Sequence, residues 1–303
     1  MVEKRLEFWP ERSPVRPIAF VTMARDEEIF LKAWICNGLR INPDADFYIL
    51  DHASTVPLSV ALEDFCSEWK GQINFIRIPA IPFDDDYKAM ALSGLAKTLI
   101  HSHAVVVSSD CDELLVGLGI HSTAVYPKLL EIAHFCAPIG FEIVQHPHAE
   151  KQFDPLVPVT EQRNFGFFAA GYTKPVVWRG RTEFGAGLHR IRDDFAYEST
   201  LALLHLRSVD TQISASRATL RRQYDLSESQ LKNGRDAHWR RPIEQKIDLH
   251  QKLLASPVIE SASVVLPQFL DELKNKHSIN GGGFWGHDIK SVSGFCSLDG
   301  ILG

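Results

Sequence analysis

The stretch Val105-Val106-Val107-Ser108-Ser109-Asp110-Cys111-Asp112-Glu113-Leu114-Leu115 joins a run of branched apolar residues to three closely spaced carboxylates. The apolar run predicts a buried strand. Carboxylates that crowd together repel one another, and burying them costs free energy unless a cation or hydrogen-bond donors compensate. An isolated cluster of this kind is most often a solvated loop or a helix cap after a core strand. Whether this carboxylate cluster is a functional site therefore has to be judged from the surrounding sequence.

Three strand–helix units precede this stretch. Short apolar runs predict strands at 17–23, 47–50 and 73–78. Amphipathic stretches predict helices at about 26–41, 57–69 and 87–101, with Asp26 as a favourable cap for the first of them. Strand–helix alternation of this kind predicts an α/β fold, with a doubly wound and mostly parallel sheet of the Rossmann-like type.

Polar clusters follow each predicted strand of this sheet. They are Thr22–Asp26, Asp51–Thr55, Asp84–Asp86 and Asp110–Glu113. In doubly wound sheets the ligand lies beyond the carboxyl ends of the strands, so we expect these clusters to converge on one edge. Carboxylate oxygens at such an edge suit Mg²⁺ or Mn²⁺, which needs few protein ligands when a phosphate completes its shell. Their position at this shared edge favours a functional site at Asp110 and Asp112 over a solvated loop or a helix cap.

The sequence lacks a glycine-rich phosphate loop. Neither G-x-G-x-x-G nor G-x-x-x-x-G-K-[ST] occurs in it. This argues against a dinucleotide-dependent oxidoreductase and against a P-loop enzyme. If a nucleotide binds here, we expect a metal to bridge its phosphates.

Basic residues concentrate after the predicted sheet. They are Lys174, Arg179, Arg181, Arg190 and Arg192. Such clustering favours a polyanionic ligand such as a diphosphate, although a solvated charged loop explains it equally well. His189 follows a Gly-x-Gly turn, and His205 lies inside an apolar run. Each is a candidate site residue, with a structural role as the alternative.

The composition is that of an ordinary globular protein. The chain has 303 residues, 45% of them hydrophobic and 23% charged, and a formal net charge of −6. An acidic balance argues against a protein that coats nucleic acid. No apolar run approaches the ~20 residues that a membrane-spanning helix needs. Five scattered cysteines without a C-x-x-C pair indicate reduced thiols, so we expect a cytoplasmic protein with at most peripheral contact with the inner face of the membrane.

The sequence suggests three regions. We expect an N-terminal arm at 1–16, a catalytic domain at 17–210 and a helical C-terminal extension at 211–303. The extension is basic through Arg217, Arg221, Arg222, Arg235, Arg240 and Arg241. We expect it to cover the cleft or to contact an acceptor, with a plain solvated charged face as the more common alternative.

Assembled in order, these pieces resemble the GT-A-fold glycosyltransferases, in particular family-2-like bacterial enzymes with a D-x-D-E motif. The matching segments are 22–28, 48–55, 110–115 and 174–177, followed by His189 and His205. They extend over about residues 17–210. The resemblance implies a GT-A-like nucleotide-sugar-binding domain that transfers a hexosyl or related glycosyl group to a glycan or lipid-linked acceptor. The resemblance further implies a role in the synthesis of surface polysaccharides or glycoconjugates.

The resemblance also implies roles for individual residues. Donor binding would fall to Thr22, Arg25, Asp51, Asp110, Lys174 and Arg181. Asp110 and Asp112 would present Mn²⁺ or Mg²⁺ to the diphosphate, with His189 or His205 as a further ligand or phosphate contact. An inverting transfer needs a carboxylate base near the acceptor hydroxyl. The candidates for the base are Glu142, Glu161 and Glu183, and Glu183 is favoured for its place in the basic loop. Asp112 is expected to be catalytic through the metal that it helps to present.

Two other functions remain open from the sequence. A sugar nucleotidyltransferase shares the sheet and the acidic metal site, but it normally carries a glycine-rich loop after its first strand. In this chain Arg25-Asp26-Glu27-Glu28 stands there instead. The third possibility is a non-catalytic binding protein on a degenerate transferase fold.

Overall fold

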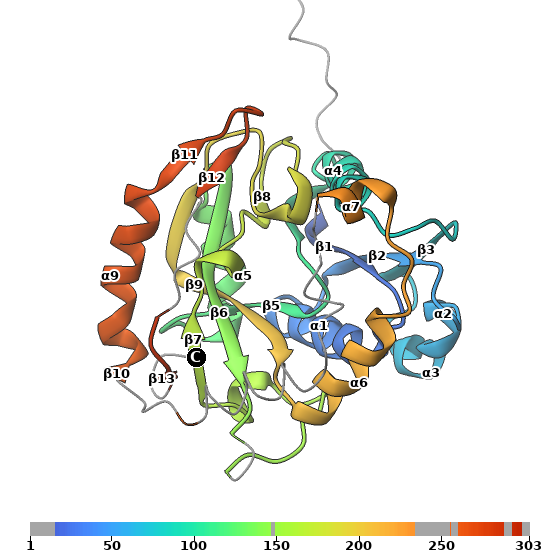
Figure 1. Ribbon diagram of the computed structural model, residues 1–303, viewed down its shortest axis with the longest axis horizontal. Coiled ribbons are helices and arrows are strands. Elements are labelled where there is room, and N and C mark those ends of the chain that lie inside the picture. The colour runs from blue at the N-terminus through green and yellow to red at the C-terminus, as the bar shows by residue number, and fades with distance from the viewer. Residues whose placement is uncertain (1–15, 147–148, 234–254, 256–259, 288–292, 299–303) are drawn as a thin grey trace, which may run out of the picture.

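The computed structural model describes residues 16–146, 149–233, 255, 260–287 and 293–298 (Figure 1). The predicted arm lies outside these residues except for Arg16. Arg235, Arg240 and Arg241 of the C-terminal extension also lie outside them. In the described part of the chain, no helix is both long and apolar enough to cross a lipid bilayer.

The N-terminal part forms four parallel strands in the order β3-β2-β1-β4. They are β1 (Arg16–Ala24), β2 (Asp46–His52), β3 (Ile73–Ile78) and β4 (His103–Ser108). The helical elements between them are α1 (Glu28–Ile41), α2 (Leu58–Ala61), α3 (Glu63–Cys66), the 3-10 turn η1 (Ser67–Trp69) and α4 (Asp85–Leu99). The predicted α/β class is confirmed, and the carboxyl ends of these strands meet at one edge.

Side chains alternate between the two faces of this sheet. Phe20 of β1 and Val105 of β4 pack into one buried cluster, together with Trp34 of α1. Val21 and Val106, each one residue further on, pack into a second cluster on the opposite face. Successive side chains of a strand point to opposite faces, so β1 and β4 are apolar and covered on both faces, whereas the outer strand β3 is partly exposed. This is why β1 and β4 are continuous apolar runs.

The two helices that begin at the carboxyl edge, α1 and α4, are capped differently at their N-termini. Asp84 caps α4, and its carboxylate accepts from the backbone N–H groups of Asp86 at 2.8 Å and Tyr87 at 3.1 Å. The predicted cap of α1 was wrong: Glu27 holds the cap position and makes no side-chain cap bond. Asp26 instead has a positive φ of 53°, and its carboxylate accepts from the Thr55 N–H at 2.6 Å. The Asp26 carboxylate therefore bonds to the loop after β2 and does not cap α1.

The middle of the chain extends the sheet with mixed pairing. Its strands are β5 (Glu113–Gly117), β6 (Phe135–Val144), β7 (Phe165–Phe168), β8 (Val177–Trp178) and β9 (Ala196–Ser208). Its helical elements are α5 (Ser122–Glu131), η2 (Val159–Glu161), η3 (Ala170–Tyr172) and η4 (Ala186–Leu188). β8 pairs antiparallel with both β4 and β6, whereas β9 runs parallel to β6 and antiparallel to β5. β9 therefore ends beside the start of β5, next to Asp112.

The C-terminal region is not only helical. Its helices are α6 (Thr211–Arg221), α7 (Glu228–Lys232) and α9 (Ala262–Asn275). Two short strands, β10 (Glu260–Ser261) and β13 (Cys296–Ser297), continue the main sheet beyond β7. A separate hairpin pairs β11 (His277–Ile279) with β12 (Trp285–His287). The region predicted as a helical extension thus also completes one edge of the sheet (Figure 1).

The segment with α6 and α7 returns to the N-terminal part of the molecule. Phe83 N–H donates to the Asp225 carbonyl at 2.7 Å, and the Gln230 side chain donates to Asp85 at 2.8 Å. The Ser227 hydroxyl also contacts Asp84. These contacts hold α7 beside the start of α4 (Figure 1). The C-terminal helices therefore form part of the wall over the carboxyl edge.

Candidate active site

A pocket of about 290 Å³ lies at the carboxyl edge of the sheet. The loops after β1, β2 and β4 contribute to its wall, as do the start of α4, the end of β9 and α6. The predicted convergence of polar strand ends is confirmed by this lining. Six of the residues singled out from the sequence lie on the wall: Arg25, Asp110, Asp112, Lys174, His189 and His205.

The loops after β1 and β2 hold each other in place. Asp26 N–H donates to the Ser54 hydroxyl at 2.9 Å, and Thr55 N–H donates to the Asp26 carboxylate at 2.6 Å. Asp26 and Ala53 both have positive φ, at 53° and 52°, a conformation that costs a non-glycine residue free energy. The reciprocal bonds fix this strained pair of turns. As a result, Arg25 and His52 are both held on the pocket wall.

Asp51 organises its own loop rather than lining the pocket. Its side chain is buried, and one carboxylate oxygen accepts from Ser54 N–H at 2.8 Å. The other oxygen accepts from Leu58 N–H at 3.1 Å and contacts Arg77 at 2.9 Å. With both oxygens used, Asp51 supports the loop that presents His52. Its predicted contact with a donor nucleoside remains a prediction.

Asp110 is held between two lysines. Its carboxylate contacts the ammonium groups of Lys88, on the first turn of α4, and of Lys174 at 3.1 Å. Lys174 also contacts Glu113 at 2.7 Å, and the Glu113 carboxylate accepts from the Asp110 N–H at 3.2 Å. Burial raises the pKa of Asp110, but Lys174 and Lys88 outweigh burial and hold it below its usual value. Asp110 is therefore ionised at neutral pH.

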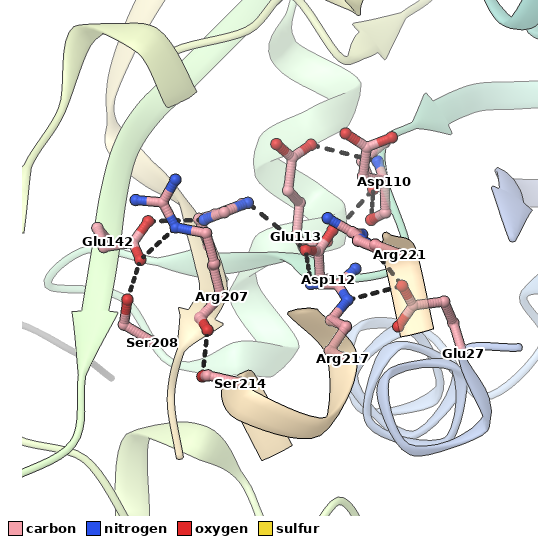
Figure 2. A network of polar contacts seen from close by, with 12 residues as sticks. Glu27, Asp110, Asp112, Glu113, Glu142, Arg207, Ser208, Ser214, Arg217 and Arg221 are labelled. Carbon is pink, nitrogen blue, oxygen red and sulfur yellow. Dashed lines mark hydrogen bonds and ion pairs between the residues drawn. The ribbon is translucent and has the colours of Figure 1, made fainter. Parts of the chain in front are cut away.

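Asp112 is compensated by the C-terminal helix α6. Arg217 of α6 contacts the carboxylates of both Asp112 and Glu27, the latter at 2.6 Å (Figure 2). Arg221, one turn further along, also contacts Glu27 at 3.0 Å. Burial raises the pKa of Asp112, but Arg217 and His205 hold it well below its usual value. The crowded carboxylates thus obtain their counter-charges from within the chain.

A second network lies behind His205. Its Nδ1 is 2.7 Å from the carboxylate of buried Glu142, which also accepts from the Ser208 hydroxyl at 2.7 Å and lies 3.5 Å from Arg207 (Figure 2). Burial raises the pKa of Glu142, but Arg207 and His205 lower it to about 2. The ring of Tyr172 stacks on His205 with centroids 4.0 Å apart. His205 is therefore fixed on two sides, and its Nε2 lies 3.5 Å from Asp112.

His189 follows a strained turn. Gly187 and Leu188 have successive positive φ angles of 76° and 63°, and Leu188 is fully buried. A Cβ at position 187 would lie 3.0 Å from the His189 ring, so glycine gives this ring room on the pocket wall. Desolvation and the positive charge of Lys174 lower the pKa of His189 to about 3. The imidazole is therefore neutral at neutral pH.

The other candidate residues from the sequence lie away from the pocket wall. Besides Asp51 they are Thr22, Glu142, Glu161, Arg181 and Glu183, together with Arg179, Arg190 and Arg192 of the basic cluster. Thr22 is fully buried, whereas Glu161 and Arg181 are exposed. Glu183, the favoured base, pairs with Lys97 of α4 at 2.8 Å on the surface. β8 runs antiparallel to β4, so the chain leaves β8 at the opposite edge of the sheet, where Arg181 and Glu183 follow, and it reaches the pocket only at Gly187 and His189.

The donor set does not fit the metal site that the sequence suggested. A divalent cation would need oxygens of Asp110 and Asp112, but ammonium and guanidinium groups already contact both carboxylates. Within the described residues, no group of three or more His, Cys, Asp or Glu side chains is placed to hold a metal ion. Asp110, Asp112, His189 and His205 share the pocket without forming such a group.

Several residues on the wall were given no site role by the sequence reasoning. They are Glu27, His52, Lys88, Tyr172, Arg207, Arg217, Arg221 and Tyr224. The place of Lys88 could have been predicted from the sequence. It lies four residues after the helix cap Asp84, so its side chain is on the same side of α4 as the cap. Arg217 and Arg221 carried a weaker signal, since a basic helix far along the chain looks like a solvated face. Only the fold brings them to Asp112 and Glu27.

Comparison with known proteins gives distant structural likenesses only. No protein-family model and no curated protein matches the chain. Among solved structures, it is similar to residues 1–349 of TarS from S. aureus, with 10% identity and a TM-score of 0.38 over 70% of this chain and 67% of that one.

Two further solved structures match smaller parts of the chain. One is the mannosyltransferase PcManGT from Pyrobaculum calidifontis in complex with GDP-Man and Mn²⁺, at 14% identity and a TM-score of 0.30 over 48% of this chain and 41% of that one. The other is an active-site mutant of LgtC, at 19% identity and a TM-score of 0.29 over 40% and 46%. Because these TM-scores are below 0.5, the roles of residues in this chain are argued from its own geometry alone.

Proposed function

We propose that this protein is a glycosyltransferase that moves a sugar from a nucleoside-diphosphate sugar to a hydroxyl group of a glycan acceptor. One observation carries the proposal: Lys88 and Lys174 meet at Asp110, and Arg25 lines the same pocket, at the carboxyl edge of β1 and β4. Cations that converge at this edge of a doubly wound sheet suit a diphosphate. The resemblance of 22–28, 48–55 and 110–115 to the GT-A-fold enzymes supports the same reading.

Arg25 is a suitable first contact for the diphosphate. Its guanidinium lies over the Tyr224 ring at 4.5 Å, and its nearest carboxylate is Asp26 at 3.8 Å from Nε. Nε is buried and has no hydrogen-bond partner among the described residues. A buried donor without a partner costs free energy that a phosphate oxygen would recover. This makes Arg25 an anion contact that the folded chain leaves incomplete.

The nucleoside is proposed to lie against His52 and Phe83. Both line the pocket beside Arg25, and their rings are 6.2 Å apart. Burial and Arg25 lower the pKa of His52, so its ring is neutral, and Nε2 has no partner among the described residues. A neutral imidazole and an aromatic ring, tilted at 58° to each other, offer two ring faces and one polar atom to a base.

The proposed reaction is a single displacement at the anomeric carbon. The acceptor oxygen forms a bond to that carbon as its proton passes to a carboxylate. The bond from carbon to the diphosphate oxygen breaks, and the nucleoside diphosphate leaves with the electron pair. None of the three expected bases, Glu142, Glu161 and Glu183, lines the pocket, whereas Asp112 does and is kept ionised by Arg217. We assign it as the proposed base, with Lys88 and Lys174 stabilising the leaving group.

The finer details stay predictions from the resemblance. These are the role in surface polysaccharide or glycoconjugate synthesis, a lipid-linked acceptor and peripheral contact with a membrane.

Thermal-shift measurements with UDP, GDP, ADP and CDP test the donor site. A diphosphate that binds the native state raises the melting temperature by mass action. We expect one or two of the four to do so, and Arg25→Gln to reduce the shift. Arg181→Gln is the matched control, because Arg181 is exposed and lies outside the pocket. No shift with any of the four would contradict the proposed donor site.

Product analysis separates the transferase from its alternatives. A transferase releases nucleoside diphosphate from the sugar donor, whereas a nucleotidyltransferase releases pyrophosphate from a nucleoside triphosphate and a sugar phosphate. A binding protein would show the thermal shift and release neither product.

A further inference from the structure

Asp110 has an ammonium group on each of its two carboxylate oxygens. Lys88 contacts Oδ1, and Lys174 contacts Oδ2 at 3.1 Å. We infer that this site binds its diphosphate without a divalent metal, with the lysine and arginine cations of the chain doing the metal's electrostatic work. The inference rests on the proposed function, since it concerns how the same donor site holds its ligand.

Lys174 cannot easily give way to a metal ion. Its side chain is buried, and its ammonium group is shared between Asp110 at 3.1 Å and Glu113 at 2.7 Å. A metal on Asp110 would place two positive charges beside this ammonium and remove one of its partners. Because like charges repel strongly where water is excluded, metal binding would work against the cation that is already there.

Asp112 is occupied in the same way. Its Oδ2 contacts the Arg217 guanidinium and lies 3.5 Å from His205 Nε2. Arg217 is buried between Asp112 and Glu27, so releasing it would leave a buried guanidinium with one partner fewer. A metal that bridged Asp110 and Asp112 would therefore disturb three fixed cations at once.

Lys88 is the cation best placed to take over the role of a metal. It lies on the first turn of α4, where the helix dipole adds partial positive charge, and it lines the pocket. Its side chain is 14% exposed, compared with 5% for Lys174, so it reaches the ligand more easily. Together with Arg25 across the pocket, it can contact the diphosphate while Lys174 keeps Asp110 in place.

The two mechanisms predict opposite effects of neutralising Asp110. In a metal site, Asp110→Asn removes a ligand and abolishes metal-dependent binding. In a site built from cations, Asp110→Asn removes a competing anion, so Lys88 and Lys174 are freed for the diphosphate. Affinity should then be retained or increase. The sign of the change separates the two mechanisms.

Calorimetric titration with inorganic pyrophosphate and with UDP and GDP, in EDTA or in Mn²⁺, provides the test. We expect Kd to differ by less than about twofold between the two conditions. Lys88→Gln should weaken binding by about tenfold in both, because it removes a charge-assisted contact. Lys97→Gln, on the same helix but paired with Glu183 at the surface, is the matched control and should bind like the parent. Melting curves confirm that each variant is folded.

Three results have distinct meanings. Equal binding in EDTA and Mn²⁺, with Asp110→Asn still binding, supports the inference. Binding that requires Mn²⁺ and disappears in Asp110→Asn overturns it but leaves the proposed donor site in place. An absence of binding in both conditions overturns the donor site, and the inference with it.

Discussion

Arg217 contacts the carboxylate of Asp112 across 105 residues of sequence. One residue belongs to a helix that follows the sheet, and the other to the loop between β4 and β5. The same guanidinium contacts Glu27, at the start of α1. Three distant segments thus share one buried cation, which makes α6 part of the site.

Replacing Arg217 with Met should strongly destabilise the protein. The change leaves the buried carboxylates of Asp112 and Glu27 without their main counter-charge, and breaking a buried pair in this way costs about 3 kcal/mol or more. Urea titration measures the loss. Arg222→Met, at the exposed end of the same helix, is the control and should change stability by less than about 0.5 kcal/mol. Equal stability of the two variants would show that Arg217 is dispensable.

The contribution of Glu142 should depend on pH. Because its pKa is about 2 in the folded protein and ordinarily 4.5, the stability it provides is present above pH 4.5 and is lost as the pH falls toward 2. Glu142→Gln should therefore cost about 3 kcal/mol at neutral pH, with the difference from the parent shrinking across this window. Urea titrations at a series of pH values measure this. A difference that stayed constant down to pH 3 would contradict the assigned shift.

Two glycine-to-alanine changes should have opposite signs. A Cβ at Gly140 of β6 would lie 2.2–2.3 Å from backbone atoms of Tyr172 and Thr173, which precede Lys174. Gly140→Ala should therefore displace this segment and cost about 2 kcal/mol or more, as overpacking does. Gly94, exposed within α4, has nothing within 4 Å of its Cβ position. Gly94→Ala should stabilise the protein by about 0.5–1 kcal/mol, and thermal melts compare the two.

Turnover distinguishes the proposed base Asp112 from Glu183 and Glu161, which the sequence suggested. Asp112 lines the pocket, so Asp112→Asn should lower kcat by about 10²–10⁴ if it accepts the acceptor proton. Glu183→Gln and Glu161→Gln should stay within about twofold of the parent, because both residues lie outside the pocket. Release of nucleoside diphosphate from a sugar donor is the measurement. A large loss in Glu183→Gln alone would return the role of base to Glu183.

The sheet was largely readable from the sequence. Its strands are short apolar runs bounded by polar clusters, a pattern contained in neighbouring residues. These runs lie at 17–23, 47–50 and 73–78 and directly before Asp110. The edge position of Arg25, Asp110 and Asp112 followed from the rule for parallel strands. The Asp26 cap was predicted wrongly because its carboxylate bonds Thr55, a partner in the next loop.

The acidic stretch that begins at Asp110 shows which features the sequence determines by itself and which depend on the tertiary structure. The sequence by itself determined that carboxylates would meet at the carboxyl edge of an α/β sheet and would need positive charge there. It did not determine the source of that charge. Lys88, Lys174 and Arg217 are brought to these carboxylates only by the packing of α4, the segment after η3, and α6. Ion pairing depends on distance in space, and residues 105 positions apart leave no local pattern that would reveal it.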